Sequence, residues 1–130
     1  MILNLSGWIR NKNLYNKTFY SYDSGWKKME NLSSENFKEK TTKGNVIVDY
    51  WAEWCGPCKM LGPIFEQLST EVEDVTFAKV NVDEEPDLAG QAGVRGIPTM
   101  VLYKDGEEVD RIVGLMPKEE LKNKIIESFS

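Results

Sequence analysis

The strongest strand signal lies at residues 46–51, where apolar side chains would point to both sides of the chain. The stretch begins with three β-branched residues and ends with two aromatic ones. A strand that is apolar on both faces is typical of a central parallel strand covered on both sides. Weaker patterns predict further strands at residues 28–32, 75–82, 99–103 and 109–113. Asp105-Gly106 lies between the last two and favours a tight antiparallel hairpin.

Helical spacing of apolar residues begins directly after the first strong strand. It predicts a helix of about four turns from Cys58 onward, with Pro63 kinking the helix without ending it. The apolar positions expected on its buried face are Met60, Leu61, Ile64, Phe65, Leu68 and Val72. Short helices are expected near residues 35–41 and 86–92, and Pro117 opens a last helix. Its expected buried stripe consists of Leu121, Ile125, Ile126 and Phe129.

The predicted elements follow the order β-α-β-α-β-α-β-β-α. Right-handed crossovers between the early parallel strands and a hairpin near the end predict an α/β fold. We expect a central mixed sheet of about five strands, flanked by about four helices that cover both of its faces.

The two ends of the chain differ in charge. Residues 1–28 contain five Lys or Arg and one Asp, a net charge of +4, whereas residues 29–130 contain 11 basic and 20 acidic residues, a net charge of −9. The first part has no regular period, which indicates an N-terminal extension: either a tail or residues upstream of a start at Met29. Its aromatic and basic residues would also suit an arm that touches RNA or a membrane. Residues 29–130 form the predicted domain, and its acidity argues against binding to nucleic acid.

The sequence lacks two features that would indicate a membrane or an exported protein, a long apolar segment and a secretory signal. No window reaches about 18 consecutive apolar residues, so we expect no segment that spans a membrane and no membrane among the partners of the domain. The N-terminus does not read as a secretory signal, which favours the cytoplasm. We also expect a monomer without a metal ion or another cofactor.

The two cysteines of the chain lie together in Cys55-Gly56-Pro57-Cys58, between the strong strand and the long helix. The helix N-terminus favours the thiolate of the first cysteine, so an exposed Cys55 would be the nucleophile. Cys58, one turn further on, would then attack the mixed disulfide that Cys55 forms. Two other interpretations stay open. A structural disulfide would constrain so short a loop only weakly, and half a zinc site would need a dimer because the chain has no histidine and no other cysteine.

Asp49 is an unusual residue for the middle of an apolar strand. Burial should raise its pKa, and a neutral acid near the thiols could exchange protons with Cys58. Lys79, in the neighbouring predicted strand, is the expected partner of Asp49, although it could also be an ordinary lysine that faces the solvent. Pro98 opens a later strand, and the sequence leaves open whether the Ile97-Pro98 bond is cis or trans.

At residues 51–60 and 95–99 the chain resembles the thioredoxin family. The first segment, WAEWCGPCKM, is similar to the family's active-site signature, and the second, RGIPT, to its substrate-facing proline loop. The resemblance covers residues 30–130 and implies the thioredoxin fold. It also implies that Cys55 attacks, Cys58 resolves, Asp49 is the buried acid and Lys79 is its companion. The substrate-binding surface that it implies consists of Trp54, Gly56, Pro57, Gly96, Ile97, Pro98, Val113 and Gly114.

The resemblance implies a dithiol carrier that reduces disulfides in other proteins and is itself reduced again by a thioredoxin reductase. Gly56-Pro57 between the cysteines separates the chain, by resemblance, from oxidising relatives. Two rival classes remain. A binding module that uses the fold as a rigid clamp would not need its thiols, and an extracytoplasmic oxidase or isomerase would need an export signal.

Overall fold

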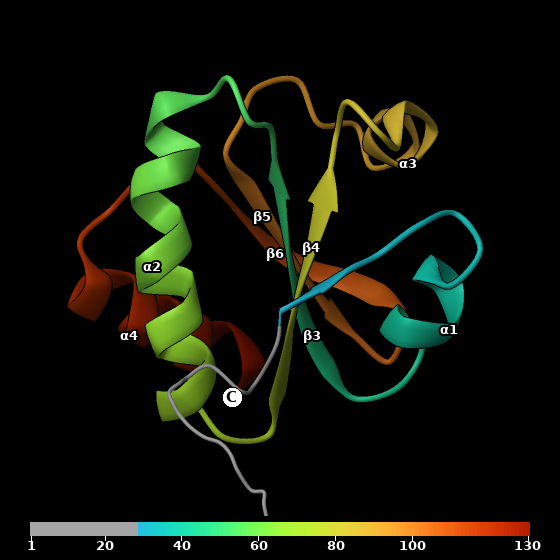
Figure 1. The fold of residues 1–130 in the computed structure, drawn as a ribbon. Coiled ribbons are helices and arrows are strands. Elements are labelled where there is room, and N and C mark those ends of the chain that lie inside the picture. The colour runs from blue at the N-terminus through green and yellow to red at the C-terminus, as the bar shows by residue number, and fades with distance from the viewer. Residues whose placement is uncertain (1–28) are drawn as a thin grey trace, which may run out of the picture.

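The computed structural model describes residues 29–130, which form one five-stranded sheet with helices on both faces (Figure 1). The predicted extension, residues 1–28, lies outside the described residues. In chain order the elements are β2 (Glu30–Asn31), α1 (Phe37–Thr41), β3 (Asn45–Trp51), α2 (Gly56–Glu71), β4 (Val75–Asn81), α3 (Pro86–Gln91), β5 (Thr99–Lys104), β6 (Glu107–Val113) and α4 (Lys118–Phe129). The predicted order of strands and helices is therefore confirmed.

The sheet is mixed, and its strands follow the order β2-β4-β3-β5-β6. β4 pairs in parallel with both β2 and β3, whereas β5 pairs antiparallel with β3 and with β6. Asp105 and Gly106 have φ angles of 50° and 92°, the left-handed values that the tight turn between β5 and β6 requires. The main chain of Asp105 donates to the Gly44 carbonyl at 2.9 Å, which ties this turn to the start of β3.

Two apolar cores lie on opposite faces of the sheet. α2 and α4 cover one face, and α1 and α3 cover the other (Figure 1). β3 contributes to both cores because successive side chains of a strand point to opposite faces. Ile47 packs with α2 and α4, whereas Val46, Val48 and Tyr50 pack on the side of α1 and α3. The expectation that this strand is covered on both sides is confirmed.

α2 is a helix of 16 residues that contains Pro63, as the sequence predicts. Its buried apolar residues are Cys58, Leu61, Phe65 and Leu68, spaced three or four positions apart. Met60 was expected on this face, but its side chain is 64% exposed. In α4 Ile126 is likewise exposed, whereas the predicted Leu121 and Ile125 are buried. Each misplaced residue precedes or follows a buried one directly, and one step along a helix turns the side chain by about 100°.

The helices of residues 29–130 include none that is long and apolar enough to cross a membrane.

Candidate active site

The two cysteines lie where β3 leads into α2, and their sulfur atoms form a disulfide. The Cα atoms are 5.2 Å apart. Cys55 is the N-cap residue of α2, and its Sγ accepts a hydrogen bond from the backbone N–H of Cys58 at 3.2 Å. Pro57 lies in the first turn of α2. Backbone N–H groups in this turn have no acceptor within the helix, so a residue without an N–H costs no hydrogen bond there. The first sulfur therefore occupies the capping position, where free backbone N–H groups and the helix dipole stabilise negative charge.

Exposure does not distinguish the two cysteines in this disulfide form. The sequence predicted an exposed Cys55, but Cys55 is 5% and Cys58 4% exposed. Ala52 and the two cysteines form a small buried cluster, against which Trp51, Val82 and Ile97 pack. The prediction failed because neighbouring apolar side chains from other elements cover the motif. Only the capping geometry separates the two sulfurs here.

The loop before β5 lies beside Cys55, although it is 42 residues away along the chain. The Sγ of Cys55 is 3.8 Å from the carbonyl oxygen of Ile97. The Ile97-Pro98 peptide bond is cis, whereas the sequence had left both the cis and the trans form open. The Pro98 carbonyl accepts from the N–H of Gly114 at 2.8 Å, which joins the loop to the end of β6. Gly96, Ile97, Pro98 and Gly114 are thus held in one region together with Cys55.

A depression of about 430 Å³ adjoins the thiols and is lined by Trp54, Val82, Ala89, Val94, Arg95, Gly96 and Ile97. Trp54 is 70% exposed, yet its indole N–H donates to the Asp83 carboxylate at 2.9 Å. This hydrogen bond orients a large apolar ring at the edge of the depression. Val113 is exposed as well. Asp83 was missed by the sequence analysis, because it lies 29 residues from Trp54 and nothing in the pattern connects them.

Asp49 lies on the α2 side of β3, between Ile47 of the core and Trp51, which packs against the cysteine cluster. Its side chain is 1% exposed, and within residues 29–130 neither carboxylate oxygen has a hydrogen-bond partner. Burial raises the pKa of Asp49 from 3.8 to about 7, and the positive charge of Lys79 offsets part of this increase. The carboxyl group can therefore both hold and release a proton near neutral pH.

Lys79 is the neighbour of Asp49 in the sheet, since the two residues are directly paired between β3 and β4. No direct ion pair joins them in the part of the chain that the structure describes. Instead, the Lys79 Nζ lies 4.5 Å from the centroid of the Trp51 ring, a cation–π contact. Lys79 thus acts on Asp49 through its charge at longer range.

Within residues 29–130 no group of three or more His, Cys, Asp or Glu side chains is arranged to hold a metal ion.

Comparisons with known proteins agree with this geometry. The thioredoxin family model matches residues 28–127. Thioredoxin from Chlamydia caviae is 53% identical over 90 residues, covering 69% of this chain and 88% of that protein, and thioredoxin from Listeria monocytogenes is 43% identical over 94 residues, covering 72% and 91%. The solved structure of a single-substitution mutant of thioredoxin from Halobacterium salinarum matches with a TM-score of 0.71 at 38% identity, covering 78% of this chain and 90% of that one.

A cysteine pair that closes at the N-terminus of α2 in this fold defines a thiol–disulfide oxidoreductase. The chain belongs to the thioredoxin family. The expected family, fold and reaction class are confirmed.

Proposed function

We propose that this protein reduces disulfide bonds in other proteins, with Cys55 as the attacking cysteine and Cys58 as the resolving one. The single observation that carries the assignment is the hydrogen bond from the Cys58 N–H to the Cys55 sulfur at the start of α2. It supports a thiolate at Cys55, and the thiolate is the form of cysteine that attacks a disulfide.

The first step forms a mixed disulfide. In the reduced protein, the Cys55 thiolate attacks one sulfur of the substrate disulfide, and a bond forms between Cys55 and that sulfur. The substrate S–S bond breaks, and its other sulfur leaves as a thiolate that takes up a proton. The carbonyl oxygen of Ile97, 3.8 Å from the Cys55 Sγ, borders the space where the substrate sulfur arrives.

The second step releases the substrate. Cys58 loses its proton and attacks the Cys55 sulfur, which closes the Cys55–Cys58 disulfide and expels the second substrate sulfur as a thiolate that takes up a proton. Two electrons have then passed from this protein to the substrate. Asp49 is our candidate for the base that accepts the Cys58 proton, because its pKa of about 7 lets it do so near neutral pH. Lys79 is a positioning residue that limits how far burial raises this pKa.

Substrate peptides would lie along the surface next to Cys55. Trp54 and Ile97 supply apolar contact area, and the main chain of Ile97 supplies hydrogen bonds to an extended peptide, as the family resemblance implies. The remaining members of the proposed surface are Gly56, Pro57, Gly96, Pro98, Val113 and Gly114. Trp54, Gly96 and Ile97 all line the depression beside the thiols, which supports this placement.

The cycle needs a donor of two electrons, and a thioredoxin reductase is the partner that the family implies. We further propose that the protein acts as a monomer in the cytoplasm, where thiols are kept reduced.

Trapping the mixed disulfide tests the assignment. Reduced Cys58→Ser protein mixed with insulin should accumulate a covalent complex with insulin through Cys55, seen by intact mass under non-reducing conditions. Matched Cys55→Ser protein should form none, and wild-type protein should reduce insulin in the presence of dithiothreitol. A complex formed by Cys55→Ser alone would reverse the two roles. A variant that carries both serines and still reduces insulin faster than dithiothreitol alone would refute the proposed function itself.

A further inference from the structure

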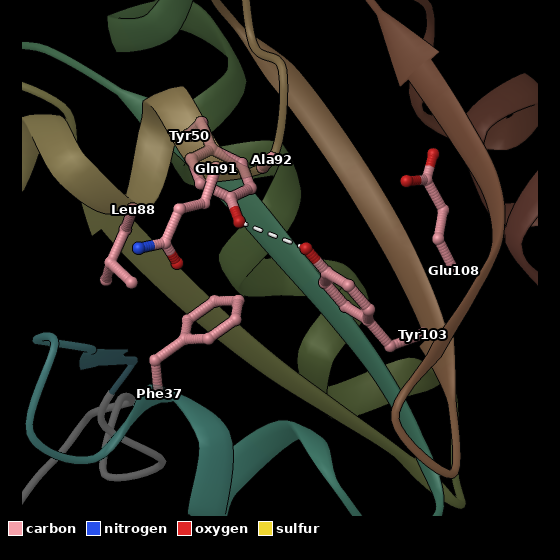
Figure 2. A pocket seen from close by; sticks show the side chains of 7 residues that line it. All are labelled: Phe37, Tyr50, Leu88, Gln91, Ala92, Tyr103 and Glu108. Carbon is pink, nitrogen blue, oxygen red and sulfur yellow. Dashed lines mark hydrogen bonds between the residues drawn. The ribbon is translucent and has the colours of Figure 1, made fainter.

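A second pocket lies on the sheet face away from α2, between α1, α3 and the strands. Its volume is about 260 Å³, and its lining residues are Phe37, Tyr50, Leu88, Gln91, Ala92, Tyr103 and Glu108 (Figure 2). Among residues 29–130 it shares no lining residue with the depression beside the thiols. Whatever it binds therefore contacts neither Trp54 nor Ile97, and the redox site does not account for it.

Two tyrosine hydroxyls meet inside this pocket. The hydroxyl oxygens of Tyr50 on β3 and Tyr103 on β5 are 3.1 Å apart, and either one can donate to the other (Figure 2). Burial raises the pKa of both tyrosines, so both hydroxyls keep their protons at neutral pH. Two hydroxyls carry two protons, and the hydrogen bond between them uses one. Among residues 29–130 the second proton has no protein acceptor, which leaves one donor and unused lone pairs at this partly buried pair.

The pocket walls are mostly apolar and partly aromatic, and Gln91 and Glu108 are their polar members among residues 29–130 apart from the tyrosine hydroxyls. The rings of Phe37 and Tyr103 meet edge to face, with centroids 5.9 Å apart and an angle of 85° between their planes. Leu88 and Ala92 of the α3 region add aliphatic surface. A dry apolar cavity of about 150 Å³ suffices for benzene, so a pocket of about 260 Å³ has room for one substituted ring.

The charges at the rim argue for an uncharged ligand. Among residues 29–130 Glu108 is the only charged residue of the lining, and Arg111 binds it through two N–H groups at 2.7 and 2.8 Å. The same guanidinium also donates to the Ala92 carbonyl at 2.7 Å. Because Arg111 is already bound to Glu108 and no basic side chain among residues 29–130 lines the pocket, an anionic ligand would find no free cation there.

We propose that this pocket binds a single-ring, uncharged phenol. The phenol ring packs against Phe37, Leu88 and Tyr103, and its hydroxyl joins the Tyr50–Tyr103 pair. It accepts the unused tyrosine proton and donates its own to a tyrosine oxygen, so the three hydroxyls satisfy one another. The same group occurs in free small phenols and in tyrosine side chains of peptides.

Nuclear magnetic resonance of the ¹⁵N-labelled full chain tests the proposal, with p-cresol as the probe and toluene as the matched probe without a hydroxyl. p-Cresol should cause saturable shifts of the backbone amides of Phe37, Gln91 and Ala92. Toluene should bind about tenfold more weakly, the equivalent of one neutral hydrogen bond. N-acetyltyrosinamide distinguishes the two sources of the phenol group. If it binds as tightly as p-cresol, the ligand is a tyrosine side chain of a peptide. If it fails to bind, the ligand is a free small phenol.

Two variants complete the test. The double variant Tyr50→Phe/Tyr103→Phe keeps both rings, and its dispersed spectrum would report an intact fold. It should lose the preference for p-cresol over toluene, whereas Trp54→Ala should keep it. The proposal is overturned by equal binding of the two probes to the wild-type protein, by shifts confined to the surroundings of Trp54, or by a double variant that still prefers p-cresol.

Discussion

Asp49→Asn should stabilise the protein above neutral pH and leave its stability almost unchanged in acid. Asparagine has nearly the shape of a protonated aspartic acid but cannot ionise. The comparison therefore isolates the cost of placing a negative charge where the side chain is 1% exposed and, within residues 29–130, has no hydrogen-bond partner.

The size of the effect follows from the pKa of Asp49, which burial raises from 3.8 to about 7. Below pH 3.8 the carboxyl group is neutral in both the folded and unfolded states, so ionisation costs nothing. Between pH 3.8 and 7 the unfolded chain loses the proton first, and the free energy of unfolding falls as the pH rises. Above pH 7 the loss is constant, at about 4 kcal/mol for a pKa difference of about 3.

Guanidinium unfolding of the oxidised proteins, followed by tryptophan fluorescence from pH 4 to 8, measures this difference. The unfolding free energy of Asp49→Asn should exceed that of the wild type by an amount that grows with pH and levels off above pH 7. Asp74→Asn is the matched control, because Asp74 is exposed and Asn tolerates the same left-handed backbone, with φ of 66°. A difference between Asp49→Asn and wild type that does not vary with pH would refute the reasoning.

Four further results are expected. Iodoacetamide near neutral pH should label Cys55 of the reduced protein before Cys58, as peptide mass mapping would show; faster labelling of Cys58 would contradict the capping argument. Trp54→Ala should lower kcat/KM for insulin about fivefold, ~1 kcal/mol, and spare the reduction of a small aromatic disulfide; equal losses on both would indicate general damage. Phe65→Ala should cost about 3–5 kcal/mol of unfolding free energy, because this ring is 1% exposed; guanidinium unfolding measures it, and a cost near zero would contradict the packing. A chain that starts at Met29 should keep insulin reduction within about twofold if the preceding residues lack a core of their own; a large loss would show that the domain begins earlier.

Most of the fold follows from local patterns. β3 is apolar on both faces and the Asp105-Gly106 turn has one favoured geometry, so the central strand and the hairpin are predictable without tertiary information. Helical periodicity is less precise. It finds α2 and α4 but overstates the width of their buried faces, as Met60 and Ile126 show, because a helix that packs on one side buries only a narrow stripe.

The site was predictable where its residues are neighbours in the chain, and less so where the sheet brings distant residues together. The Cys55–Cys58 pair and the buried Asp49 follow from short segments. The Trp54–Asp83 hydrogen bond, the Tyr50–Tyr103 pair and the cover that hides Cys55 depend on which strands are adjacent and in what register. A single sequence does not specify which strands are adjacent or in what register they pair.

The middle position of β3 determines which part of the molecule should open last. β3 pairs along its length with β4 and with β5, whereas β2 is two residues long and β6 has a neighbour on one side only. Sheets fray from their edges, and amides of central strands exchange with solvent only through the largest openings. The amide protons of β3 should therefore exchange most slowly. Because β3 runs directly into the Cys55 motif, partial unfolding at either edge leaves the cysteines on the most persistent part of the backbone.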